Sequence, residues 1–273
     1  MIAVGLVLAV VSAVAINASY ALQHAAASRV PPLSLRHPLR SFGSLVHSGR
    51  WTLGFLGGIA GWVVYVVALR LAPLSLVQAA SAGGIGVLVI GGGRLRPAER
   101  IGVGAALSGL VLLALSVGPH AAGGRGNATG VAVWMLASVA VAGGAARLLP
   151  SGAGLGTAAG VLYAAGDIGT KAAVVGGARL LFVPALLACH GLAFVSMQFA
   201  FQRGRRLSTA GLAVLWMNAL PILAGTVLFG EALPGGWRGG ARVGAFALVL
   251  AGAVALGRRD PRALPPAEAQ LGY

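Results

Sequence analysis

The chain has 273 residues, of which 58% are hydrophobic and only 9% charged, and its mean hydropathy is +0.88. A soluble globular domain carries roughly 25% charged residues, so this composition excludes an ordinary water-soluble fold. It also excludes disorder over most of the chain. The single cysteine, Cys189, excludes a disulfide framework. The net charge of +15 would indicate a nucleic-acid partner in a soluble protein. Here the arginines stand between apolar runs, as in polytopic membrane proteins, and no nucleic-acid partner is expected.

Nine apolar runs approach the roughly 20 residues that a helix needs to cross a bilayer. They lie at 2–24, 51–69, 72–93, 101–118, 129–146, 155–175, 180–202, 207–229 and 243–257. The runs are apolar on all sides, which favours helices over alternating barrel strands. We therefore expect an all-α, polytopic membrane protein with about nine transmembrane helices. Residues 1–257 would form one transmembrane domain, and 258–273 a disordered cytoplasmic tail. Arg242 is expected to snorkel from the end of the short last run.

The loops between the runs carry most of the arginines on one side. Fourteen lie on the side of the C-terminal tail and five on the other side. The positive-inside rule then predicts a cell (inner or plasma) membrane protein with an outside N-terminus and a cytoplasmic C-terminus. No basic residue precedes the first run, which argues against a cleaved signal peptide. Three prolines in the loop 29–50 favour a cytoplasmic linker, with a surface helix over 40–46 as the alternative.

Two segments far apart in the sequence are similar. ASYALQHAA (residues 18–26) aligns with AGDIGTKAA (residues 165–173), which sets Tyr20 opposite Asp167 and His24 opposite Lys171. GVLVIGGGRLRP (86–97) aligns in the same way with GTVLFGEALP (225–234). Matched helices are five apart in chain order, so they cross the membrane in opposite directions. This pattern predicts two inverted halves, about 1–118 and 155–257, joined by a helix at 129–146. Inverted repeats with a site at their interface are typical of secondary transporters.

Two longer segments carry a family resemblance. They are ALRLAPLSLVQAASAGGIGVLVI (68–90) and FAFQRGRRLSTAGLAVLWMNALPILAGTVLFGEAL (199–233). In these segments the chain resembles the drug/metabolite transporter superfamily of EamA-like permeases. It resembles the NIPA-type magnesium transporters more distantly, in the nine-helix pattern, in Gln23-His24 at the end of the first helix and in Trp51 at the start of the second. The first resemblance implies a permease, not an enzyme, that moves a small organic solute or metabolite by alternating access. The second implies a magnesium or divalent-cation transporter. Arg94 at a position expected to be Glu, and the scarcity of acidic residues, disfavour the magnesium path.

A non-transporting scaffold or partner subunit is the alternative of a different class. The expected partners are membrane lipids and a small solute. Coupling of transport to a proton or another ion, and assembly as a homodimer, are both left open. No cofactor or metal site is expected, because no metal-ligand spacing occurs. Glycines four apart (Gly57/Gly61, Gly152/Gly156/Gly160 and Gly236/Gly240/Gly244) predict close helix contacts.

Asp167 and Lys171 are the only full charges inside the nine runs. Four residues apart on one helix face, they are able to pair with each other. A charge at membrane depth is costly, so the pair is interpreted either as a binding or coupling site or as a packing device. The other candidates for substrate binding or coupling are His24, Tyr20, Gln23, Gln198, Trp216 and Asn218. Weaker candidates are His190, Asn17, Trp62, Tyr65 and Tyr163. For each of these, interhelical hydrogen bonding or packing is the alternative interpretation.

Overall fold

The computed structural model describes residues 2–34, 38–81, 97–116, 124, 126–149, 151–231 and 235–257. All regular secondary structure in these ranges is helical. The first part of the chain forms α1 (Ile2–Ala27), α2 (Pro38–Val46), α3 (Gly49–Leu71), α4 (Leu74–Ser81) and α6 (Pro97–Ser116). The second part forms α7 (Ala128–Leu148), α8 (Ser151–Ala173), the 3-10 helix η2 (Gly177–Leu181), α9 (Phe182–Arg203), α10 (Arg206–Phe229) and α11 (Trp237–Gly257).

Five of these helical segments are long and apolar enough to cross a membrane. They are Ile2–Ala27, Gly49–Leu71, Ala128–Leu148, Gly177–Arg203 and Thr209–Phe229. The prediction of an all-α membrane-embedded protein is confirmed at this level. α6, α8 and α11 occupy three more of the predicted runs. The run 72–93 begins with α4, and its part after Ser81 lies outside the described residues, as does the tail 258–273.

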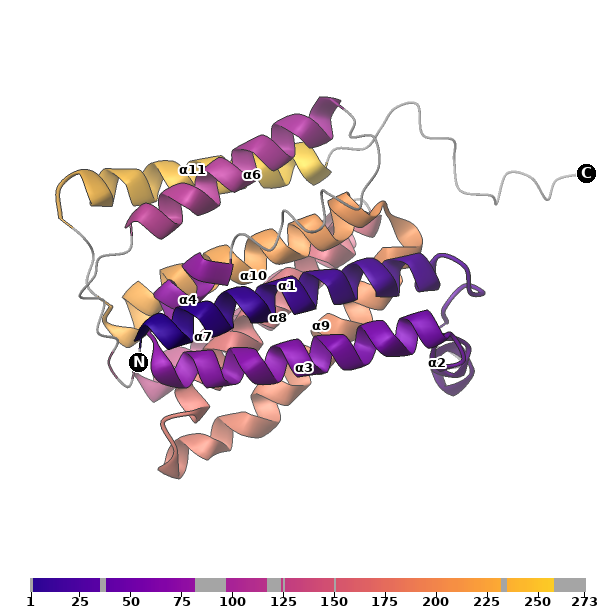
Figure 1. Ribbon diagram of the computed structural model, residues 1–273, viewed down its shortest axis with the longest axis horizontal. Helices are drawn as coiled ribbons and strands as arrows, with labels where there is room; N and C mark the ends of the chain where they lie inside the picture. Colours follow the sequence, from indigo (N-terminus) through magenta and orange to yellow (C-terminus); the bar gives the residue numbers. More distant parts are fainter. Residues whose placement is uncertain are drawn as a thin grey trace, which may run out of the picture.

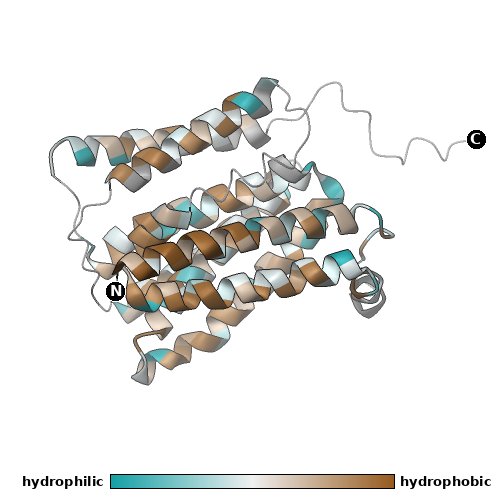
Figure 2. Ribbon diagram, in the orientation of Figure 1, coloured by the Kyte–Doolittle hydropathy of each residue, from teal (hydrophilic) through white to brown (hydrophobic). Residues whose placement is uncertain are grey.

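Apolar side chains cover the outside of the bundle, and polar side chains lie inside it. Val7, Leu56 and Leu136 are each more than half exposed, whereas Asn17, Gln78 and other polar residues are nearly inaccessible. Figure 2 shows hydrophobic residues along the outward surfaces of α1 and α3. This distribution matches a protein whose surrounding solvent is hydrocarbon, where every buried polar group must find a partner inside the protein.

The helices pack in pairs. α1 lies along α3, α8 packs against α9, and α6 and α11 lie side by side at one edge of the molecule (Figure 1). Gly156 and Gly160 allow α8 to approach α10 closely, since an added Cβ would lie 2.6 Å from the carbonyl oxygens of Thr209 and Ala213 respectively. The predicted close contact is therefore confirmed for the glycines of α8. It is confirmed also for Gly61 of α3, where an added Cβ would lie 2.9 Å from Cγ1 of Ile16 on α1.

Other predictions on glycines and on loops need correction. A Cβ on Gly57, Gly240 or Gly244 would meet no described atom within 4 Å, so these glycines mark no close helix contact there. The linker prediction is wrong for Pro38–Val46, which forms α2. Proline is tolerated at the first position of a helix, because its missing N–H has no partner there. The alternative of a surface helix is thus confirmed.

Arg242 does not snorkel to the membrane surface. It is only 6% exposed. Its Nε donates to the Ser116 hydroxyl at 3.2 Å, and its Nη1 donates to the Thr226 hydroxyl at 2.8 Å. The guanidinium therefore joins the end of α6 to α10 and α11, because polar partners inside the bundle replace the water that a snorkelling side chain would reach.

Candidate functional site

A cavity of about 460 Å³ lies among six helices. Its walls are formed by α1, α3 and α4 from the first part of the chain and by α8, α9 and α10 from the second part. Its polar and aromatic lining residues are Ser12, Asn17, Ser19, Tyr20, Gln23, Phe55, Trp62, Tyr65, Gln78, Ser81, Tyr163, Asp167, His190, Phe194 and Asn218. The volume and the mixture of aromatic walls with a few polar groups are those of a small-molecule site.

Asp167 is the acidic residue among the described residues of the cavity lining and is only 3% exposed. Its Oδ1 lies 3.5 Å from Nε2 of His190 on α9. Its Oδ2 accepts a hydrogen bond of 3.2 Å from the amide of Gln78 on α4, which also donates to the hydroxyl of Tyr65 on α3. A buried carboxylate needs such partners to offset the cost of its desolvation. Asp167 therefore links α8 to three other helices of the cavity wall.

The predicted pair between Asp167 and Lys171 does not form. The Lys171 ammonium instead donates to the carbonyl oxygens of Leu69 and Ala72, at 2.9 and 3.0 Å. These carbonyls belong to the end of α3, where a helix has acceptors without intrahelical partners and a partial negative charge. The long lysine side chain reaches this helix end, and Asp167 turns to His190 and Gln78 in the cavity wall.

Glu231 binds the N-terminal end of α4, the helix that follows α3 in the chain. Its Oε1 accepts from the backbone N–H of Leu74 at 3.0 Å, and its Oε2 accepts from that of Ser75 at 3.2 Å. These are the first N–H groups of α4, where a carboxylate is favoured by the helix dipole. Glu231 is only 2% exposed. Arg94, which the repeat alignment sets opposite Glu231, lies outside the described residues.

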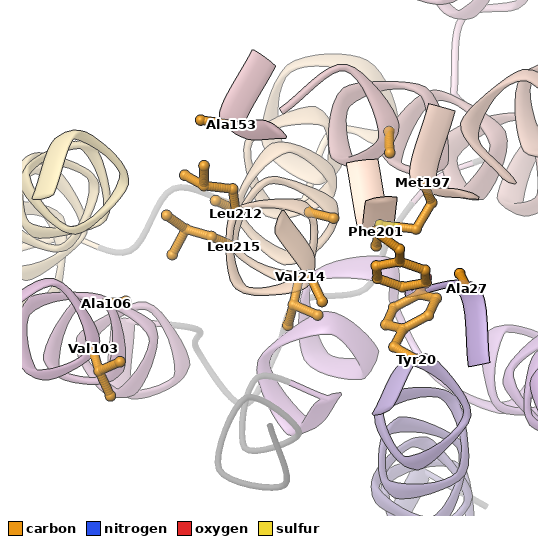
Figure 3. Packing of buried hydrophobic residues seen from close by; sticks show 14 of the residues in the cluster. Tyr20, Ala27, Val103, Ala106, Ala153, Met197, Phe201, Leu212, Val214 and Leu215 are labelled. Atoms are coloured by element: carbon orange, nitrogen blue, oxygen red, sulfur yellow. The ribbon is translucent and has the colours of Figure 1, made fainter. Parts of the chain in front are cut away.

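His24 and Tyr20 lie in the C-terminal part of α1. The His24 Nε2 is 3.4 Å from the carbonyl oxygen of Gly204, the residue that caps the end of α9. Its ring meets the Phe201 ring edge-on, with centroids 5.4 Å apart. The Tyr20 ring packs on the same phenylalanine (Figure 3). Its centroid lies 6.3 Å from that of Phe201 and 6.2 Å from that of Tyr163. Tyr20 lines the cavity, and His24 lies beyond its lining.

A chain of amide hydrogen bonds supports the α1 wall. The Gln198 side chain donates to Oε1 of Gln23 at 2.7 Å and accepts from the indole of Trp51 at 2.9 Å. Gln23 in turn donates to the Ser19 hydroxyl at 2.8 Å. Gln23 and Ser19 face the cavity, and Gln198 lies outside the lining. Gln198 therefore positions Gln23.

Two asparagines have buried oxygen atoms to which no described protein group donates a hydrogen bond. Asn17 and Asn218 each donate their amide nitrogen to the carbonyl four residues earlier, at 2.8 and 2.7 Å. Their Oδ1 atoms are buried without a hydrogen-bond partner among the described residues, as is Nε1 of Trp62. All three side chains line the cavity. Buried polar atoms are nearly always satisfied, so these three atoms mark positions for a ligand or for water.

The predicted site residues thus divide into two groups. Tyr20, Gln23, Asp167 and Asn218 line the cavity, whereas His24, Lys171, Gln198 and Trp216 do not. The weaker candidates Asn17, Trp62, Tyr65, Tyr163 and His190 all line it. Gln78 and Glu231 were missed. A polar residue in the apolar run 72–93 was the available signal for Gln78.

Within the described ranges, no three His, Cys, Asp or Glu side chains gather as the ligands of a metal ion would. Comparisons with protein-family models, with curated proteins and with solved structures find no match for this chain.

Proposed function

We propose that this chain is a permease that moves a small organic solute across a cell membrane by alternating access between two inverted halves. The observation that carries the proposal is a buried carboxylate, Asp167, in a cavity walled by three helices from each half. A binding site at the interface of inverted repeats is the design of many secondary transporters. An ionisable residue at membrane depth is by default a functional group.

The helix contacts support an inverted repeat. Exchange of the two halves pairs α1 with α8, α3 with α9, α4 with α10 and α6 with α11. Under this exchange, the α1–α3 contact corresponds to α8–α9, and the α1–α4 contact corresponds to α8–α10. The α4–α10 and α6–α11 contacts each join two helices that the exchange swaps, so the exchange leaves these contacts unchanged. α7 packs mainly against α8, as the joining helix of the proposed architecture would.

Two side-chain contacts between the halves are related by the same pairing of helices. Lys171 of α8 donates to the end of α3, and His24 of α1 lies against the carbonyl that ends α9. The sequence alignment already sets His24 opposite Lys171. In the proposed orientation, with the N-terminus outside, Lys171 closes the outer end of the cavity and His24 the cytoplasmic end. Alternating access requires that one of these ends opens while the other stays closed.

The proposed architecture has nine spans. Five are the long apolar segments named above, and the other four are α6, α8, α11 and the run 72–93, which begins with α4. α8 is less apolar than those five because most of its length is surrounded by other helices rather than by lipid. A helix inside a bundle is free to carry Asp167 and Thr170, since protein groups satisfy their polar atoms.

Uptake into proteoliposomes tests the proposed function. Purified protein is reconstituted, and the uptake of a panel of labelled amines, amino acids, sugars and carboxylates is compared with that of protein-free vesicles. We expect protein-dependent uptake of at least one solute and its loss in Asp167→Asn. Uptake of Mg²⁺ in place of any organic solute would support the divalent-cation alternative. The absence of any protein-dependent uptake across the panel would favour a scaffold or partner subunit.

A further inference from the structure

The electrostatics of the cavity favour a positively charged ligand. Asp167 is the only acidic residue in its lining, and neither Lys nor Arg is among the described residues that line it. The unpartnered donor of the Trp62 indole lies beside the His190 ring, with ring centroids 5.4 Å apart, and Nε2 of that ring faces Asp167 at 3.5 Å. An anionic ligand placed beside the Asp167 carboxylate would be repelled by its like charge.

The unpartnered asparagine oxygens require a ligand that donates hydrogen bonds. Asn17 is 3% exposed and Asn218 is 2% exposed, and they project from α1 and α10. A reversed amide would place its oxygen against the carbonyl of Ala13 or Val214, so the hydrogen bonds fix each Oδ1 as the free acceptor. A protonated amine supplies N–H donors to such acceptors, whereas a quaternary ammonium does not.

The remaining walls are suited to the apolar body of such a ligand. The rings of Tyr20, Tyr163 and Trp62 line the cavity and offer faces on which a cation or an apolar group packs favourably. On the side of α3 and α9 the lining is exposed, with Ile59 at 45% and Leu187 at 53%. These residues lie within the apolar spans Gly49–Leu71 and Gly177–Arg203, so this side of the cavity adjoins the hydrocarbon.

We propose that the cavity binds a lipophilic organic monocation with at least one N–H donor, which reaches it from the bilayer between α3 and α9. The ammonium lies near Asp167 and the two asparagine oxygens, and the apolar body lies against the aromatic rings. This inference rests on the proposed function and specifies the substrate class of the same site.

Binding to the purified full-length protein in detergent micelles tests the inference without requiring transport. The probe is 2-phenylethylammonium. Its matched comparators are the quaternary phenylethyltrimethylammonium, the neutral 3-phenylpropan-1-ol and the anionic 3-phenylpropionate. Isothermal titration should give a Kd for the primary ammonium about tenfold or more below that of each comparator. Asn17→Ala and Asn218→Ala should weaken the binding of the primary ammonium and leave that of the quaternary compound nearly unchanged.

Quenching of tryptophan fluorescence locates the probe. Trp62 lines the cavity and Trp216 does not, so Trp62→Phe should remove the ligand-dependent signal and Trp216→Phe should retain it. Equal or tighter binding of the neutral or anionic comparator, or no binding of the primary ammonium, would overturn the inference. In that case, protein-dependent uptake of a neutral or anionic solute into proteoliposomes would still support the proposed permease function. A wrong substrate class is thereby distinguished from a wrong function.

Discussion

Lys171 and Glu231 lie on the two sides of one turn. Lys171 donates to the carbonyl oxygens at the end of α3, and Glu231 accepts from the first N–H groups of α4. The α3–α4 turn thus has a cation at the negative end of one helix dipole and an anion at the positive end of the next. Both charged residues come from the second half of the chain, so the turn is held by side chains distant in sequence.

This arrangement predicts that either substitution destabilises the protein. Lys171→Met and Glu231→Gln each leave helix-end groups and an opposite charge without compensation. A hydrogen bond to a charged group contributes typically about 1.5–3 kcal/mol to stability. We therefore expect lower midpoints of thermal unfolding in detergent and lower yields of monodisperse protein. Arg147→Met is the matched control, since Arg147 is exposed and makes one long hydrogen bond of 3.5 Å. Parental unfolding midpoints for both variants would contradict the described contacts.

The partner of Asp167 is tested by double-mutant cycles. Asp167→Asn combined with His190→Gln should show a coupling energy of about 0.5–3 kcal/mol, because the two side chains are in contact. Asp167→Asn combined with Lys171→Met should be nearly additive in the free energy of unfolding. If Asp167 and Lys171 paired as the sequence predicts, the double variant would be more stable than either single variant. Such a recovery of stability would contradict the partners of Asp167 described above.

The close approach of α8 to α10 predicts a second class of destabilising variants. Gly156→Ala and Gly160→Ala would place a methyl group 2.6 Å from a backbone oxygen of α10, so the helices must separate. Overpacking of this kind costs typically about 1–3 kcal/mol. Gly144→Ala on α7 is the control, since its methyl group would meet no described atom within 4 Å. The comparison is read from thermal unfolding, and equal midpoints for all three variants would argue against tight packing of α8 on α10.

The excess of arginines on one side predicts the orientation of the chain. A reporter that is active only in the cytoplasm should work when fused after Tyr273 and fail when fused before Met1. Fusions in cells, scored by reporter activity at matched expression levels, provide the measurement. Activity at both ends would require an even number of spans.

The sequence predicted the helices because long apolar runs specify membrane spans almost independently of their surroundings. α1, α3, α7, α9 and α10 appear at the predicted places within a few residues. Their ends shifted where the sequence gives only weak signals, as at Gly49, where α3 begins two residues before the apolar run. The prolines favoured a linker over 29–50, but α2 begins at Pro38, because a proline is accommodated at the first position of a helix.

The site was predicted less well, because a helical spacing reports only neighbours on the same helix. The interval between Asp167 and Lys171 places them on one face, but it carries no information about the end of α3, where the ammonium finds its acceptors. Asp167 was found because a charge in an apolar run is conspicuous. Gln78 was missed because an uncharged amide stands out little until the fold brings it to Asp167.

Accessibility of the cavity from both sides of the membrane tests alternating access most directly. Cys189 is the only cysteine, so Cys189→Ala provides a cysteine-free background. Ile16→Cys on α1 and Met217→Cys on α10 then place one thiol in each half of the cavity lining, and Ala142→Cys on α7 serves as a buried control outside it. A membrane-impermeant thiol reagent is applied to intact cells and, separately, to inside-out vesicles. The account predicts that both cavity thiols react from both sides while the control does not. Reaction of both thiols from one side only, or from neither, would contradict it.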